Sequence, residues 1–269
     1  TTCQAAAAVK DEDAANAACG SSEIIHAPSD DEPFAVIDKP RFLPSAPLYE
    51  GDDSAFTRAA AVYPFLLGVN GKKPCEHGLL HRIDTLTSGL LLVASTQAAY
   101  ESLSTAQDSG LFVKTYRAVC RQLKGQEQCG FAPLPHDFNI ESFLTCKQNY
   151  TVKSKFRPYS AGSKQVRPVT EYSGEAARKK ASGKEYSTVI CAKKCLASDT
   201  AEIFCSITSG YRHQVRCHLA WLGIPVRNDP LYDPCYNPDC TPEESFDFSA
   251  VKIEFPNPVT GKKEIFSLV

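Results

Sequence analysis

Several short stretches of the chain carry apolar side chains in patterns that predict β-strands. The stretch "GLLLVAS" is apolar at almost every position, which is typical of a strand buried on both faces. The stretch "LFVKTYRAVC" has a period of two, which places Phe112, Lys114, Tyr116 and Ala118 on one face. From these patterns we expect strands at residues 34–40, 89–95, 111–120, 184–192 and 201–208.

Two stretches have the pattern of helices. Residues 96–110 begin after a capping hydroxyl residue and end at a glycine. Residues 210–223 place apolar side chains on one stripe and end at a glycine shortly before a proline. Arg212 and Arg216 would then share a face of the second helix, and their repulsion suggests an anionic partner for one of them. Two solvated arginines would have the same spacing.

The remaining segments have the composition of connections. Residues 1–33 are rich in Ala and acidic side chains, so we expect a mobile or loosely packed extension. Residues 121–185 are polar with scattered Pro and Gly, which predicts irregular structure. Because strands do not alternate regularly with helices, residues 34–269 are expected to form one domain of the α+β class. Its sheet would be mixed but largely antiparallel, flanked by helices and loops.

The overall composition is that of a globular protein. The 269 residues are 43% hydrophobic and 22% charged, and no apolar stretch approaches the ~18 residues of a membrane span. The first twenty residues have no secretory pattern, so we expect an intracellular, cytoplasmic protein, although a location in the nucleus or an organelle is also compatible. We also expect a monomer without a membrane partner. The twelve cysteines contain no Cys-x-x-Cys pair, which favours free thiols over a disulfide framework.

Charge is unevenly distributed along the chain. The formal net charge is −2, which alone argues weakly against a nucleic-acid partner. Residues 1–53 carry eleven acidic and three basic side chains, whereas residues 147–194 carry twelve basic and three acidic ones. The second segment is either a surface that faces phosphates or a solvated loop region.

The stretch "HRIDTLTSG" at residues 81–89 places the carboxylate of Asp84 on a loop before a buried strand. A loop carboxylate is usually a turn former or a helix cap. Three motifs, in the order in which they occur, favour a catalytic role instead, because together they resemble the RluA-type pseudouridine synthase family.

The first motif, "HRIDTLTSGLLLVA", resembles the His-Arg-Leu-Asp-x-x-Thr-Ser-Gly signature of that family. The second, "KTYRAVC", resembles its Lys-x-Tyr-x-Ala strand. The third, "GYRHQVRCHLAWLGIPVRNDPLY", resembles Gly-Arg-Thr-His-Gln-Ile-Arg-x-His-Leu followed by a Gly-x-Pro turn and Asp-x-x-Tyr. With weaker echoes in "VIDKP" and "FPNPVTGK", the likeness spans roughly residues 34–262.

The chain departs from the family pattern at four positions. Phe42 replaces the glycine after the Lys-Pro pair, Tyr211 stands at an arginine position and Arg212 at a threonine position. Asn257 stands where histidine is common. These departures bear on the choice of substrate more than on the chemistry.

The resemblance implies an RNA pseudouridine synthase that acts on rRNA or tRNA with Asp84 as its nucleophile. It implies that Arg216 pairs with Asp84, that Tyr116 packs against the flipped uracil and assists proton removal from C5, and that Arg82 fills the vacated space. No metal or other cofactor is required, because isomerisation can proceed with side chains alone. Further RNA contacts are expected from the same motifs, at His81, Arg82, Lys114, Arg212, His213 and Gln214.

The residues allow other interpretations. A catalytically silent RNA-binding homologue would use the same groove, but the intact set of Asp84, Tyr116 and Arg216 favours an enzyme. A hydrolase of the glycosidic bond is a further alternative. A zinc site at His213, Cys217 and His218 lacks a second pair of ligands, and an aspartic protease would need a second copy of "DTLTSG".

Overall fold

The structure of the chain is a computed structural model that describes residues 22–49, 51–123, 131–146, 148–197, 199–241 and 245–269. These residues belong to two compact units. The first unit comprises Thr1–Phe112 together with Ala250–Val269, and the second comprises Val113–Ser249.

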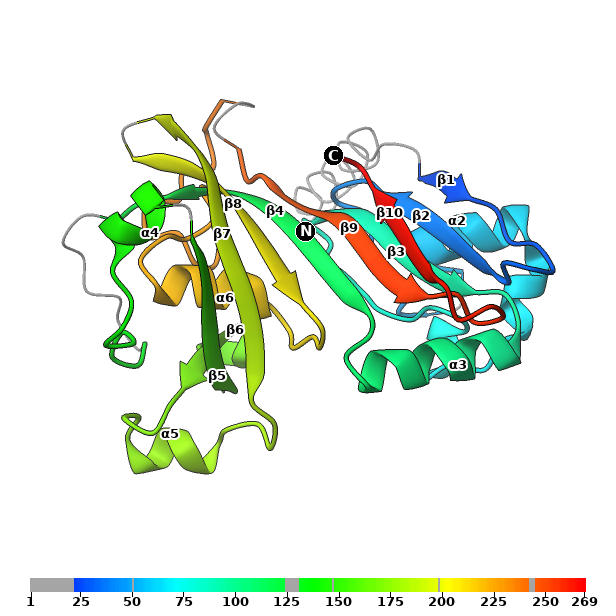
Figure 1. Ribbon diagram of the computed structural model, residues 1–269, viewed down its shortest axis with the longest axis horizontal. Helices are drawn as coiled ribbons and strands as arrows, with labels where there is room; N and C mark the ends of the chain where they lie inside the picture. The colour runs from blue at the N-terminus through cyan, green and yellow to red at the C-terminus, as the bar shows by residue number, and fades with distance from the viewer. Residues whose placement is uncertain (1–21, 50, 124–130, 147, 198, 242–244) are drawn as a thin grey trace, which may run out of the picture. The chain divides into compact units, whose positions relative to one another are not determined.

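The first unit contains a sheet in which β3 lies between β2 and β9. The pairings of β1 with β2, β2 with β3 and β9 with β10 are antiparallel, and the register of β2 on β3 runs from Phe34 opposite Ala94 to Lys39 opposite Gly89. Its strands are β1 (Glu23–His26), β2 (Phe34–Lys39), β3 (Ser88–Ala94), β9 (Phe248–Pro256) and β10 (Lys263–Ser267). Figure 1 shows these strands side by side.

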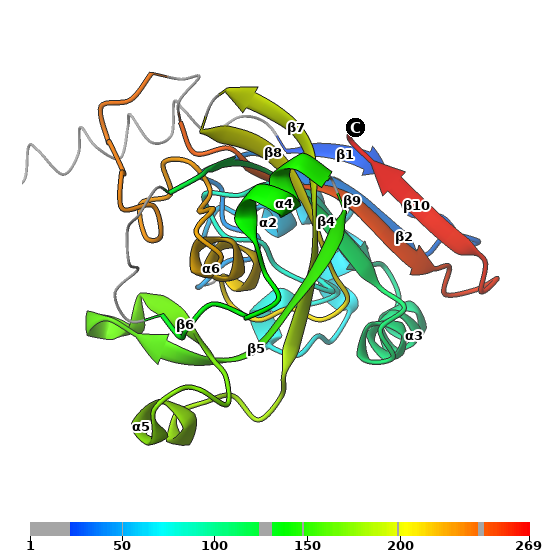
Figure 2. The same ribbon diagram turned by 60° about the vertical axis from the view of Figure 1, so that its left-hand side comes forward.

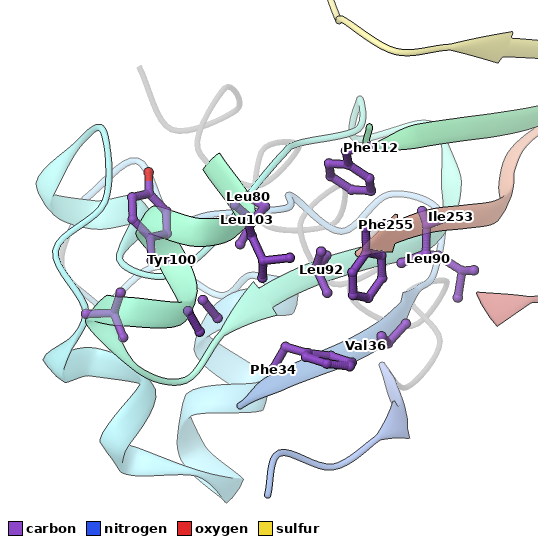
Figure 3. Packing of buried hydrophobic residues seen from close by; sticks show 13 residues of the cluster. Phe34, Val36, Leu80, Leu90, Leu92, Tyr100, Leu103, Phe112, Ile253 and Phe255 are labelled. Carbon is purple, nitrogen blue, oxygen red and sulfur yellow. The ribbon is translucent and has the colours of Figure 1, made fainter. Parts of the chain in front are cut away.

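The helices of the first unit have clear local signals. The side chain of Thr96 accepts a hydrogen bond from the backbone N–H of Ala99 and so caps the helix that packs on β3. The helices are α2 (Ala55–Val62) and α3 (Gln97–Asp108), with 3₁₀ turns at Pro64–Gly68 and Pro74–Glu76. Figure 3 shows Leu92 of β3 near Phe34 and Phe255 in the core that these elements enclose.

The second unit contains five strands in the order β4-β8-β7-β5-β6, and every neighbouring pair is antiparallel. The strands are β4 (Val113–Arg121), β5 (Asn149–Tyr159), β6 (Gln165–Val169), β7 (Tyr186–Ala197) and β8 (Thr200–Ile207). The helices are α4 (Ile140–Cys146), α5 (Glu175–Lys179) and α6 (Gln214–Trp221), with a 3₁₀ turn at Ala161–Ser163. Helix α6 lies beside β6 and β7 (Figure 2).

Most of the predicted elements are confirmed. Strands β2, β3, β4, β7 and β8 and helix α3 occur where the apolar patterns place them. Lys114, Tyr116 and Ala118 are buried on one face of β4, as the period of two predicts. The pairings confirm an α+β fold with a largely antiparallel sheet.

Three predictions differ from the structure. Residues 121–185 are not an irregular connection, because they contain α4, β5, β6 and α5. Residues 1–21 lie outside the described part of the chain, but Glu23–His26 of the expected extension forms β1 and pairs with β2. The predicted helix 210–223 is also too long, since α6 spans Gln214–Trp221.

The late start of α6 has a backbone cause. His213, directly before the helix, has a φ of 55° and lies in the left-handed region, which ends any regular helix on its N-terminal side. Arg212 therefore precedes the helix, and the prediction that it shares a helical face with Arg216 is wrong. All eight residues of α6 are buried, so the helix has no exposed stripe.

The described residues bear on two further expectations. The cysteines that the structure describes are free thiols, as the sequence predicts, and Cys205 and Cys217 are buried. In the described part of the chain, no helix combines the length and the apolar character that a membrane span needs.

Candidate active site

Asp84 lies on the loop that leads into β3 in the first unit. The backbone carbonyl of Asp84 accepts a hydrogen bond from the N–H of Thr87 at 2.9 Å, which closes a tight turn. The side chain is half-buried, next to the buried Ile83. Asp84 is thus a turn residue in its backbone geometry, and the role of its carboxylate as a nucleophile stays a prediction.

A second loop, residues 40–45, holds the backbone on both sides of Asp84. The hydroxyl of Ser45 donates to the carbonyl of Ile83 at 2.8 Å and accepts the N–H of Ile83 at 3.1 Å. The N–H of Phe42 donates to the carbonyl of Thr85 at 2.7 Å. These main-chain contacts fix the position of the carboxylate from both directions, which is what a preorganised catalytic group needs.

Lys39 forms hydrogen bonds with both the loop 40–45 and the Asp84 loop. Its side chain is fully buried at the end of β2, and its ammonium group donates to the carbonyls of Pro40, Leu43 and Thr85 at 2.9, 2.7 and 3.3 Å. Burying a charge is costly unless hydrogen bonds compensate it, so these carbonyls keep Lys39 in place. The Lys-Pro echo in the sequence marked this residue, but sequence reasoning gave it no role.

Gly89 explains why the motif that contains Asp84 ends in glycine. Its φ is +115°, and a Cβ atom at this position would lie 2.2 Å from the carbonyl oxygen of Ala250 in β9. Any other residue would push β3 away from β9 and displace the preceding turn. The glycine therefore sets the close approach that anchors the Asp84 loop.

His81 and Arg82 differ in exposure. His81 is buried, its Nε2 accepts the N–H of Leu92 at 3.3 Å, and its ring meets Phe112 edge to face at 5.1 Å. Arg82 is exposed and forms a salt bridge of 3.0 Å with Glu76. Of the two, only Arg82 presents its charge to solvent, and the predicted RNA contact of His81 stays a prediction.

In the second unit, a row of aromatic rings connects Tyr116 with Arg216. The ring of Tyr116 on β4 stacks on Phe248 with centroids 5.2 Å apart, and Phe248 meets Phe246 at 6.1 Å. The guanidinium carbon of Arg216 lies 5.4 Å from the ring centre of Phe246 and 5.4 Å from that of Tyr232. The structure thus brings these two predicted catalytic residues into one cluster, by way of aromatic side chains that the sequence analysis did not single out.

Arg216 forms a buried bidentate salt bridge with Asp229. Nε and Nη2 of Arg216 lie 2.8 and 2.7 Å from the two carboxylate oxygens, and both side chains are almost fully buried. Asp229 also accepts the backbone N–H groups of Leu231 and Tyr232. Asp229 is the anionic partner that the sequence predicted for one of the arginines, and the expected pairing of Arg216 with Asp84 stays a prediction.

The residues before and at the start of α6 are held by hydrogen bonds within the second unit. The amide of Gln214 donates to Ser187 and Thr188 and accepts the N–H of Tyr211. Nδ1 of His213 lies 3.1 Å from the hydroxyl of Tyr232. Burial raises the pKa of Tyr232, so its phenol stays protonated at neutral pH.

Two further predicted RNA contacts lie in different surroundings. Arg212 is exposed, and its Nη2 donates to the carbonyls of Ser163 and Gln165 between β5 and β6. Lys114 is buried on β4. Lys114 and Gln214 are therefore buried inside the second unit, whereas Arg212 lies on its surface.

Part of the basic segment 147–194 forms strand β5, which has one exposed side. Its residues alternate between exposed and buried, so Lys153 and Lys155 are exposed while Val152, Ser154 and Phe156 are buried. Arg157 continues the exposed side and is partly covered. The segment 147–194 is thus neither a mobile loop nor an unstructured tail in this part of the chain.

The described residues offer no group of three or more His, Cys, Asp or Glu side chains that could hold a metal ion. His218 instead bonds to the hydroxyls of Ser154 and Thr188 at 3.0 and 2.9 Å. Burial lowers the pKa of His218 to about 3. The functional signals that sequence reasoning missed are Lys39, Asp229 and Tyr232; the last two lie in the quoted "NDPLY" stretch.

Comparison with solved structures defines the class of fold. The human RNA pseudouridylate synthase domain containing 1 matches 93% of this chain and 83% of its own chain with a TM-score of 0.62, at 18% sequence identity. The human RNA pseudouridylate synthase domain containing 4 matches 97% of this chain and 92% of its own, with a TM-score of 0.60 at 16% identity. The fold is therefore the pseudouridine synthase fold.

Sequence comparison defines the family. The family model described as RNA pseudouridylate synthase matches residues 33–221. The chain therefore belongs to the RNA pseudouridylate synthase family, the RluA-type isomerases that its three motifs resemble.

Two curated relatives give the scale of the similarity. The chain is 29% identical over 213 residues to pseudouridylate synthase RPUSD2 of Homo sapiens, which covers 79% of this chain and 32% of the relative. It is 28% identical over 204 residues to the tRNA pseudouridine(31) synthase of Saccharomyces cerevisiae, which covers 76% of this chain and 45% of the relative. The chain thus matches about a third to a half of the length of these relatives.

Proposed function

We propose that this chain isomerises uridines in structured RNA to pseudouridine, with Asp84 as the nucleophile. The observation that carries the proposal is the Asp84 loop, whose backbone is held by Ser45 at Ile83 and by Phe42 at Thr85. The names of related proteins refer both to tRNA and to the ribosomal large subunit, so the substrate we propose is tRNA or rRNA.

The reaction balances without a co-reactant. The N1–C1′ bond of uridine breaks, the uracil turns, and a C5–C1′ bond forms. The hydrogen on C5 leaves as a proton and N1 gains a proton. A carboxylate can attack C1′, remove the 2′ proton to give a glycal, or add to C6, and each route needs an ionised Asp84. No electrons are transferred, so the reaction requires no redox cofactor, and each proposed step uses side chains alone.

Three other side chains have roles in this proposal. The family resemblance assigns Arg216 to Asp84, and a guanidinium near a carboxylate favours its ionised form. Tyr116, already stacked on Phe248, offers its ring to the uracil and its hydroxyl to the proton that leaves C5. Arg82 fills the place of the extruded nucleotide, which must leave the stack before any side chain can reach C1′.

RNA binding beyond the target nucleotide rests on exposed basic groups. Lys153, Lys155 and Arg157 follow one another on the exposed side of β5, and Arg212 is exposed next to the connection between β5 and β6. Alternate residues of a strand are about 6.6 Å apart, a distance comparable to successive phosphates of a nucleic-acid strand. We propose that the RNA backbone follows this face, with His81, Lys114, His213 and Gln214 supporting the site rather than the backbone path.

The decisive test replaces the nucleophile. Asp84→Asn should retain the fold and RNA affinity but lose pseudouridine formation by roughly a thousandfold or more. RNA labelled with tritium at C5 of uridine releases the label as the C5–C1′ bond forms, so tritium release measures turnover directly. Asp108→Asn, at an exposed carboxylate in α3 of the same unit, is the matched control and should be fully active.

The same experiment distinguishes an enzyme from a silent RNA-binding homologue. A silent homologue would bind RNA and release no tritium with or without Asp84. Comparable turnover by wild type and Asp84→Asn would remove Asp84 from the role of nucleophile.

A further inference from the structure

Phe42 has an unusual combination of backbone conformation and exposure. It follows β2 in the loop 40–45, its φ is +65°, and its side chain is 53% exposed. A bulky residue rarely adopts the left-handed region, which is the natural place for a glycine. The chain thus keeps a strained aromatic residue where the family pattern has glycine, and this residue contributes nothing to the apolar core.

The surroundings impose the conformation of Phe42. Its N–H donates to the carbonyl of Thr85 at 2.7 Å, and the next residue, Leu43, is buried. The ammonium group of Lys39 donates to the carbonyl of Leu43 at 2.7 Å. Because the backbone is fixed on both sides, the exposed ring of Phe42 projects from a fixed point of the loop.

That position lies next to the proposed nucleophile. Phe42 contacts Thr85, the residue directly after Asp84, and Ser45 of the same loop contacts Ile83, the residue directly before it. The loop 40–45 therefore runs along the Asp84 turn, with the Phe42 ring exposed at one end. Single exposed hydrophobic residues are common on proteins, but a strained aromatic residue bonded to a catalytic turn calls for a reason.

We propose that Phe42 is a stacking site for a nucleobase of the RNA substrate, adjacent to the target uridine. The inference rests on the proposed function and deepens it. Every nucleobase has a π-face, so an exposed ring held at a fixed position binds a base without reading its sequence. Arg82 fills the place that the target nucleotide leaves, and an unpaired base beside that place stacks on the ring of Phe42.

The chain offers a spectroscopic test of this site. Its single tryptophan, Trp221, is buried in α6, so a tryptophan placed at Phe42 supplies a distinct exposed signal. Phe42→Trp should show saturable fluorescence quenching when a uridine-rich stem–loop RNA or an oligouridylate is added. Phe65→Trp is the matched control, since Phe65 belongs to the same unit and is also 53% exposed. Its signal should change little.

Affinity and turnover supply a second readout. Phe42→Leu removes the ring and should weaken RNA binding about tenfold, because loss of base–aromatic stacking typically costs one to two orders of magnitude. The effect should lie in KM rather than kcat, and the slope of affinity against salt should not change, since no phosphate contact is lost. Phe42→Gly should bind as weakly as Phe42→Leu while unfolding no earlier than wild type, because glycine relieves the left-handed strain.

The outcomes separate this inference from the proposed function. Equal quenching of Phe42→Trp and Phe65→Trp, or wild-type affinity of Phe42→Leu, would overturn the stacking site. Both measurements concern binding and need no turnover. Full activity of Asp84→Asn would therefore refute the proposed chemistry and leave the stacking result standing.

Discussion

Replacement of Asp229 by alanine should destabilise the second unit far more than an ordinary substitution does. Asp229 is fully buried and compensates the guanidinium of Arg216, which is itself buried under Phe246 and Tyr232. Without the carboxylate, the buried guanidinium of Arg216 loses its bidentate ion pair. Two backbone N–H groups, of Leu231 and Tyr232, lose their acceptor as well.

The magnitude follows from these contacts. Removing one partner of a buried salt bridge costs about 3–5 kcal/mol. Each lost backbone hydrogen bond adds about 0.5–1.5 kcal/mol. We therefore expect Asp229→Ala to lower the free energy of unfolding by about 4–8 kcal/mol, a large part of the roughly 5–15 kcal/mol that stabilises a typical protein.

Urea unfolding followed by tryptophan fluorescence measures this effect locally. Trp221 lies on the same helix as Arg216, and its Nε1 donates to the carbonyl of Ala132 at 2.9 Å, so its emission reports the packing of α6. Arg216→Met should cost less than Asp229→Ala, because Asp229 would still accept the two backbone N–H groups. The double variant Arg216→Met/Asp229→Ala should lose less than the two single losses added together, since neither charge of the pair is then left without the other.

The double-mutant cycle also decides whether the reasoning is correct. If the loss in the double variant equals the sum of the two single losses, the side chains are not energetically coupled. A loss of less than about 1 kcal/mol in Asp229→Ala would likewise contradict the account of a buried compensating charge.

Three further predictions concern RNA, cofactors and pH. Changing Lys153, Lys155 and Arg157 to Gln should weaken the binding of different RNAs to a similar extent. The slope of log K against log salt, measured by filter binding, should fall by about 0.7–0.9 for each phosphate contact that is lost. An unchanged slope would mean that the RNA binds elsewhere. Turnover should survive dialysis against EDTA, and a loss that zinc restores would contradict a reaction based on side chains alone. Burial holds the pKa of His218 at about 3 in the folded chain, below its value of about 6.5 in the unfolded chain. The contribution of neutral His218 to stability is therefore complete above pH ~6.5. It falls by up to about 1.4 kcal/mol per pH unit as the pH decreases toward 3. Between neutral and acidic pH, the urea midpoint of His218→Gln should therefore change less than that of wild type. Plots of the urea midpoint against pH that run parallel for the two proteins would refute this.

The elements that the sequence predicted well are those whose signals are local. Strand β3 is a continuous apolar run, and α3 has a capping threonine before it and a glycine after it. The alternation of β4 likewise predicted which face holds Tyr116. The three motifs pointed to the RNA pseudouridylate synthase family because the residues of each motif are close together in the chain, and the family match confirms that family. The roles that the motifs assign to Asp84, Tyr116 and Arg216 stay predictions.

The elements that the sequence misjudged depend on partners far along the chain. Strands β5 and β6 have polar and basic compositions, and they become strands because β5 pairs with β7 and covers an apolar interior with Val152 and Phe156. Helix α6 loses its predicted first turn because His213 adopts a left-handed backbone conformation next to Tyr232. No local pattern encodes either contact.

The same division applies to the site. The sequence identified a carboxylate on a loop and an arginine on a helix, because residue types and spacing are local properties. Only the tertiary structure paired Arg216 with Asp229, placed Phe42 against Thr85, and buried Lys39 beneath both loops. A charge or a strained backbone is stable only where particular distant groups compensate it, and those groups come together only in the folded chain.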